Sequence, residues 1–141
     1  MLFRSDPAVA DRVAAELVAL GKRPVICRDV PGFMWNRIQM AILREAVWLL
    51  ENDVASPDAV DAVLSDGLAR RWKAVPFLSA IALGGVETWQ RTAGNLFPEL
   101  STQTERPDLG RWVDPHAPGL GALARRRDLL LAEQLQTDEG G

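Results

Sequence analysis

The first 28 residues alternate between apolar and polar positions in a way that predicts a strand, a helix and a second strand. Residues 1–4 (MLFR) and 24–27 (PVIC) are apolar runs of strand length. Between them, apolar residues keep the spacing of one helix face: Ala10, Val13, Ala14, Leu17 and Leu20. Asp6 and Pro7 fit the N-cap and first position of this helix, and Gly21 fits its end.

A strand–helix–strand unit normally belongs to a larger parallel sheet that is covered on both faces. No segment after residue 28 alternates between apolar and polar residues or shows a β-branched run, so no further strand is predicted. We therefore expect residues 1–28 to be the remnant of the end of an α/β domain. Two short parallel strands have unpaired edges, which indicates a missing neighbour.

From Phe33 onward the pattern is helical. Residues 33–52 carry two adjacent apolar stripes, formed by Ile38, Ala41, Ile42, Ala46 and Leu49 and by Met40, Leu43, Val47 and Leu50. A helix that is apolar over so much of its circumference should be buried on several sides. In a chain of this size we expect one of those sides to be covered by a second copy, which predicts a homodimer through helix 33–52.

The rest of the chain predicts further helices and one irregular segment. Ser56 and Pro57 start a helix that Gly67 is expected to end. Residues 70–97 contain one or two helices, divided by Gly84-Gly85, and residues 121–136 form a last amphipathic helix. The predicted fold is mainly α, with a remnant α/β unit at 1–28, a helical domain at 29–100, and an irregular segment with a final helix at 101–141.

Composition excludes several classes of function. The 141 residues carry 16 Lys and Arg against 19 Asp and Glu, a net charge of −3, so no chain-wide positive field attracts nucleic acid. The single Cys and single His exclude an internal disulfide and a zinc site of the usual kind. The single His, His116, lies in the Pro-rich stretch DPHAPG and is predicted to be a surface residue. No apolar run reaches the length of a membrane span and no signal peptide is recognised, so we expect a cytoplasmic protein.

One polar residue stands out at the start of the long helix. Asn36 follows the turn-forming sequence DVPG and lies between Trp35 and Arg37. An uncharged amide can donate a hydrogen bond to a developing oxyanion without titrating. It can equally cap or bridge helix ends, and the residue type alone favours that structural role.

Three stretches of the chain resemble the 3-hydroxyacyl-CoA dehydrogenase family, in particular its C-terminal domain in the branch of lambda-crystallin and carnitine dehydrogenase. They are SDPAVADRVAAELVALGK (5–22), GKRPVICRDVPGFMWNRIQMAILREAVWLLENDVASPDAVDAVLSDGLARRW (21–72) and VPFLSAIALGG (75–85). The resemblance covers roughly residues 5–100. It implies a helical domain that closes the substrate cleft and forms a dimer, next to a Rossmann-type domain that binds NAD.

The resemblance also assigns roles to individual residues. Asn36 matches the family's Asn at the head of the first long helix, whose amide supports a catalytic His and the substrate oxygen. Trp35, Arg37 and Met40 are then expected to bind substrate on that helix, and Pro76 and Phe77 to line the cleft. Two departures affect the cleft: the family usually has Gly-Pro-Phe-Glu where this chain has VPFL (75–78), and a small or β-branched residue in place of Trp35.

The dinucleotide-binding machinery of the family is missing from the sequence. No G-x-G-x-x-G occurs, and GLGALA (119–124) does not follow a predicted strand. The resemblance therefore implies that the chain binds no cofactor alone and meets NAD only through a partner chain.

Three hypotheses follow. The chain is the substrate-binding and dimerisation part of a 3-hydroxyacyl-CoA dehydrogenase that works on an acyl thioester with a separate NAD-binding protein. Alternatively it is a repurposed, NAD-independent enzyme acting on an acyl or cyclic substrate, with Arg37, Arg44 or Glu45 assisting Asn36. Thirdly, it is a non-catalytic dimeric scaffold.

Overall fold

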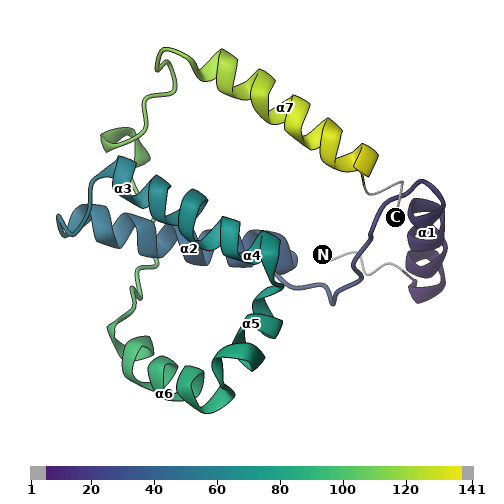
Figure 1. Cartoon of the computed structure of the whole chain (residues 1–141), viewed down its shortest axis with the longest axis horizontal. Helices are drawn as coiled ribbons and strands as arrows, with labels where there is room; N and C mark the ends of the chain where they lie inside the picture. The colour runs from purple at the N-terminus through teal and green to yellow at the C-terminus, as the bar shows by residue number, and fades with distance from the viewer. Residues whose placement is uncertain (1–5, 138–141) are drawn as a thin grey trace. The chain divides into compact units, whose positions relative to one another are not determined.

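Helices make up all of the regular structure in residues 6–137, the part of the chain that this computed structural model describes (Figure 1). Side-chain surroundings are described for residues 6–133. The mainly α fold class predicted from the sequence is confirmed. Contacts divide the chain into two units, Met1–Trp35 with Val113–Gly141, and Asn36–Trp112.

The first unit holds helix α1 (Pro7–Ala19) and helix α7 (Leu120–Thr137). The Asp6 carboxylate accepts a hydrogen bond from the backbone N–H of Ala8 (2.9 Å), and Gly21 follows the helix with a φ of 71°. These are the start and stop signals that the sequence predicts. α7 agrees with the final helix predicted at 121–136.

The strand predicted at residues 24–27 is wrong. Residues 22–30 carry no regular structure, and the side chains of Val25 and Ile26 are exposed. A strand exists only through hydrogen bonds to a neighbouring strand, and none occurs between residues 6 and 137 to supply them. The partner strand predicted at residues 1–4 lies outside the described residues. The apolar run at 24–27 is therefore a loop in this structure.

Helix α2 (Phe33–Glu51) confirms the long helix predicted at 33–52. Its C-terminal half packs against the rest of its unit, where Val47 is only 1% exposed. Its N-terminal half does not, since Ile38 is 62% exposed and Met40 is exposed as well. Val47 is the one residue of α2 that is buried within this chain, and the burial of this helix on several sides stays a prediction.

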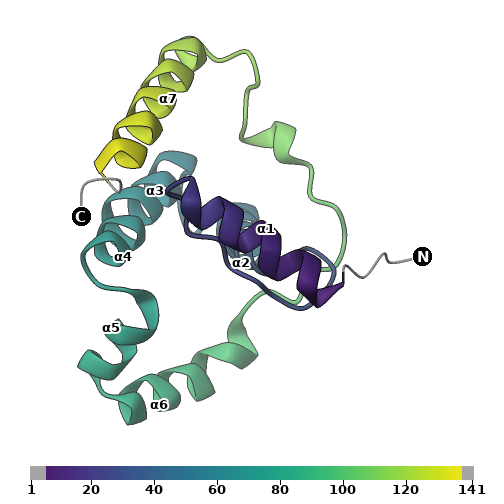
Figure 2. The same ribbon diagram turned by 90° about the vertical axis from the view of Figure 1, so that its right-hand side faces the viewer.

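A second helix runs alongside α2 in both views (Figures 1 and 2). It consists of α3 (Pro57–Ala62), a π-helical stretch η1 (Val63–Ala69) and α4 (Arg70–Ala74). The Ser56 hydroxyl caps its start by accepting a hydrogen bond from the N–H of Ala59 (3.2 Å), as predicted.

The prediction that Gly67 ends this helix is wrong, because Gly67 lies inside η1 and the helix continues to Ala74. A glycine permits a left-handed exit from a helix but does not enforce one. Val75 is the first residue to leave, with a φ of −140° and a ψ of 124°. Pro76 follows it, and a residue before proline is sterically driven out of the helical region.

Helices α5 (Phe77–Gly84) and α6 (Val86–Leu96) complete the helical part of the second unit. They are separated at Gly85, whose φ of 86° confirms the predicted break at Gly84-Gly85. The two short 3-10 turns, η2 (Phe97–Glu99) and η3 (Leu109–Arg111), are the only regular structure described between α6 and α7, in agreement with the irregular segment predicted there. Buried hydrophobic residues in the described chain are few: Val47, Val60 and Ala80.

Candidate functional site

Asn36 lies in the first turn of α2, directly after a tight turn. Gly32 has a φ of 80° there, and the N–H of Phe33 donates to the carbonyl of Val30 (2.9 Å). This turn starts α2 with the Asn36 side chain exposed to solvent. Its side-chain amide forms no hydrogen bond within the described part of the chain. A residue that caps a helix or bridges two helix ends would need such a bond. The structure therefore offers no support for the purely structural role of Asn36.

One face of α2 connects Asn36 with the buried part of the molecule. Asn36, Met40, Leu43 and Val47 follow each other at intervals of four, three and four residues, which places them on one side of a helix. Along this side, exposure falls from the exposed Asn36 and Met40 to the half-buried Leu43 and the buried Val47. We call this stripe the Asn36 face.

The other predicted site residues on α2 lie beside this face. Trp35 is 80% exposed and Arg37 is exposed, so Trp35, Asn36, Arg37 and Met40 together form an open polar and aromatic surface at the head of α2. An exposed Trp of this kind is unusual in a folded monomer and is typical of surfaces that contact a ligand or a partner.

Phe77 is instead part of an aromatic cluster. Its ring meets Trp72 edge-on at a centroid distance of 5.9 Å and Trp89 at 6.0 Å. The Arg71 guanidinium lies over the Trp89 ring at 5.9 Å from its centroid. Phe77 thus ties α4, α5 and α6 together, while Pro76 sets the start of α5. The cleft-lining role of Pro76 and Phe77 stays a prediction.

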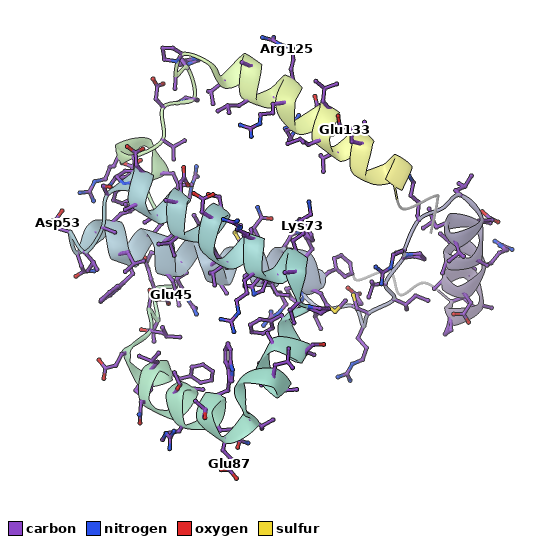
Figure 3. The ribbon with its side chains drawn as sticks, in the orientation of Figure 1. Glu45, Asp53, Lys73, Glu87, Arg125 and Glu133 are labelled. Atoms are coloured by element: carbon purple, nitrogen blue, oxygen red, sulfur yellow. The ribbon has the colours of Figure 1, made fainter. Side chains whose placement is uncertain are left out.

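Glu45 performs a structural task that the sequence did not reveal. Its carboxylate oxygen Oε1 accepts a hydrogen bond from the backbone N–H of Ser101 (2.8 Å), which joins α2 to the segment after α6 (Figure 3). Ser101 is 6% exposed, and its hydroxyl in turn accepts the N–H of Gln103 (3.3 Å). A carboxylate engaged in this way is an anchor for the backbone. Its involvement disfavours the hypothesis in which Glu45 assists Asn36 in a repurposed enzyme.

A pocket of about 550 Å³ opens on the Asn36 face two turns further along α2. Its walls are Leu43 of α2 and the whole of the segment 106–110: Arg106, Pro107, Asp108, Leu109 and Gly110. No motif pointed to this pocket, because the irregular segment reaches α2 only through tertiary packing.

Neither a cluster of metal-ligating side chains nor a dinucleotide-binding loop after a strand occurs in the described residues. No group of three or more His, Cys, Asp and Glu side chains gathers in the part of the chain that the structure describes. His116 is exposed, and its backbone N–H donates to the Asp114 carboxylate (2.8 Å). Gly119 precedes α7 after a turn, with no strand before it between residues 6 and 137, so GLGALA lacks the strand–loop–helix setting of a dinucleotide site. No helix in the described residues is long and apolar enough to cross a membrane.

The sequence of residues 32–111 matches the profile of the family described as 3-hydroxyacyl-CoA dehydrogenase, C-terminal domain. The chain belongs to this family. The matched range contains the Asn36 face, the pocket and the Glu45–Ser101 anchor, and it ends at the last residue of η3. The family resemblance found in the sequence is thereby confirmed.

Individual relatives support the same assignment. The chain is 37% identical over 107 residues to a lambda-crystallin homolog of Mus musculus, covering 73% of this chain and 34% of that protein. It is 33% identical over 113 residues to L-carnitine dehydrogenase of Streptomyces griseus, covering 77% of this chain and 34% of the enzyme. The chain thus spans about a third of the length of these relatives.

A solved structure shares the fold. It is that of 5-formyl-3-hydroxy-2-methylpyridine 4-carboxylic acid 5-dehydrogenase, an NAD⁺-dependent dismutase, with a TM-score of 0.79 and 23% identity. The match covers 96% of this chain and 49% of that one. At this identity the likeness establishes the helical fold of the family.

Proposed function

We propose that this chain is the substrate-binding and dimerisation part of a 3-hydroxyacyl-CoA dehydrogenase-like oxidoreductase. In this proposal, the substrate is a 3-hydroxyacyl thioester of fatty acid metabolism, and Asn36 donates a hydrogen bond to its reacting oxygen. NAD is bound by polypeptide outside these 141 residues, which also supplies the catalytic His. A cytoplasmic location is part of the same proposal.

The observation that carries this proposal is the state of Asn36. It lies within the matched range of the family, at the head of α2, and its amide is exposed with no hydrogen bond among the described residues. A donor that no neighbour occupies can be offered to a substrate without breaking a bond inside the protein. The exposed Trp35, Arg37 and Met40 around it supply apolar contact and one positive charge.

A homodimer through α2 is the second part of the proposal. Phe33, Trp35 and Ile38 are more than half exposed on the N-terminal half of this helix. An interface of ordinary size removes about 800 Å² from each partner, so association can cover this apolar surface.

The first experiment is the native mass of the protein isolated from its own cells, with every co-purifying chain identified. We expect a complex that contains two copies of this sequence and a Rossmann-type region with a glycine-rich loop. A homodimer in which no NAD-binding polypeptide is present would contradict the oxidoreductase proposal. The repurposed enzyme or the scaffold would then be the better description.

The matched variants Asn36→Ala and Gln39→Ala then test the role of Asn36 in that complex. Both residues are uncharged amides, exposed, and three positions apart on α2. Loss of one hydrogen-bond donor to a developing oxyanion lowers kcat about 100-fold or more. We expect this for Asn36→Ala in the oxidation of 3-hydroxybutyryl-CoA, with Gln39→Ala within about threefold of the parent. Equal activities of the two variants would refute the assignment.

A further inference from the structure

The pocket on the Asn36 face is lined by one cation that forms no ion pair with the described residues. Arg106 lines the pocket, and its guanidinium forms no hydrogen bond or ion pair with the described residues. The two acids nearest to it in sequence, Glu105 and Asp108, form no ion pair with it. The Asp108 carboxylate instead accepts the N–H of Gly110 (3.2 Å). The other cation of this segment, Arg111, lies over the Trp112 ring at 4.8 Å and does not line the pocket.

The remaining walls are suited to hydrocarbon. Leu43, Pro107 and Leu109 contribute apolar surface, and Leu43 is half-buried at the base of the Asn36 face. A pocket of about 550 Å³ is within the usual range for small-molecule sites, which are mostly apolar with a few polar groups that fix orientation. An arginine in such a wall is the natural partner of a carboxylate or a phosphate, because its planar fork forms two parallel hydrogen bonds.

The position of the pocket relates it to Asn36. Leu43 lies seven residues after Asn36 on the same helix face, so about 10 Å separates the two along the helix axis. Both belong to the unit Asn36–Trp112. A ligand with its anionic end in the pocket therefore needs at least about seven bonds of about 1.5 Å each to reach Asn36.

We infer that this pocket, headed by Arg106, binds the anionic end of a small ligand whose other end is presented to Asn36. The inference rests on the proposed substrate-binding role of the Asn36 face and adds an anchoring residue to it. Carboxylate and phosphate groups share the required chemistry. Asp108 places a negative charge at the same opening, which opposes a doubly charged phosphate more than a singly charged carboxylate, so we expect a carboxylate to bind more tightly.

Titration of the full chain with butyrate and, separately, with inorganic phosphate tests this inference by NMR. We expect butyrate to shift the backbone amide signals of Leu43, Asp108 and Gly110 with a Kd in the millimolar range. Removal of a charge-assisted hydrogen bond weakens binding about tenfold or more. The variant Arg106→Gln should show this loss, while Arg111→Gln removes the same charge nearby and should leave the Kd within about twofold.

Each outcome decides the matter. Arg106-dependent binding of either probe supports the pocket, and the tighter probe identifies the anionic group. Absence of binding at 50 mM of both probes (about 50 times a 1 mM Kd), or equal weakening by Arg106→Gln and Arg111→Gln, would overturn the inference. The titration requires neither NAD nor turnover, so its failure is distinct from that of the proposed function, which the Asn36→Ala kinetics decide.

Discussion

The hydrogen bond between Glu45 and Ser101 should be a measurable part of the stability of the chain. It connects residues 56 positions apart and fixes the irregular segment after α6 to α2 through the Glu45 side chain. The donor, the backbone N–H of Ser101, belongs to a residue that is 6% exposed. If the carboxylate is removed, this N–H is left without a partner in a place that solvent reaches poorly.

The cost follows from that burial. An unsatisfied buried donor costs about 1–3 kcal/mol, and Glu45 itself is half-buried, so we expect about 2 kcal/mol for Glu45→Ala. Glu45→Gln keeps an amide oxygen as acceptor but loses the charge, and neutral hydrogen bonds are about half as strong. We therefore expect about 1 kcal/mol for Glu45→Gln. Both variants should retain the helix content of the parent, since Ala and Gln are good helix formers.

Urea unfolding followed by circular dichroism measures these differences at one fixed protein concentration, which matters if the chain associates. Glu51→Ala is the matched control, because Glu51 lies on the same helix, is exposed and forms no hydrogen bond or ion pair among the described residues. Hydrogen exchange of the Ser101 amide provides a second readout, which should accelerate in the order parent, Gln, Ala. Stability losses for Glu45→Ala no larger than for Glu51→Ala, with unchanged exchange at Ser101, would refute the reasoning.

Two further substitutions test the helical packing. At Gly84 an added Cβ would lie 2.8 Å from the indole nitrogen of Trp89, whereas at Gly94 no atom lies within 4 Å of an added Cβ. In thermal unfolding we therefore expect Gly84→Ala to be destabilised by about 1–3 kcal/mol and Gly94→Ala to be stabilised by up to about 1 kcal/mol. The reverse order of stabilities would contradict the packing. Ser56→Ala removes the acceptor for the N–H of Ala59 and should lower the free energy of unfolding by about 1 kcal/mol, whereas Ser56→Gly should lower it by only a few tenths of that amount. Equal losses for the two variants in urea unfolding would show that the hydroxyl does not cap the helix.

Local signals were predicted well because they depend on neighbours in the sequence. Asp6 and Ser56 cap helices through hydrogen bonds to residues two and three positions away. The positive φ of Gly85 ends α5 and separates it from α6. Asn36 was found as a candidate because the turn before it and the helix after it are both encoded nearby, and because its surroundings matched a family whose membership the comparison confirmed.

Local signals also failed where two of them compete. Gly67 was expected to end a helix, but the helix continues through it as a π-helical stretch and ends only where Pro76 excludes Val75 from the helical region. A proline imposes a steric limit, whereas a glycine merely allows an exit. The sequence contained both signals but not their relative strength.

Contacts between distant residues were decided only by the tertiary structure. The run at 24–27 has the composition of a strand, but without a neighbouring strand in the described residues it remains a loop. Glu45 was a candidate to assist Asn36 in a repurposed enzyme, and its contact with Ser101 makes it an anchor. Arg106 was one cation among many until the segment 106–110 met Leu43 and formed a pocket. The sequence by itself determined the helices, their caps and the family, because these arise from spacing and sterics along the chain. The partner of Glu45 and the pocket around Arg106 were decided by packing, because they depend on which residues meet when distant segments come together.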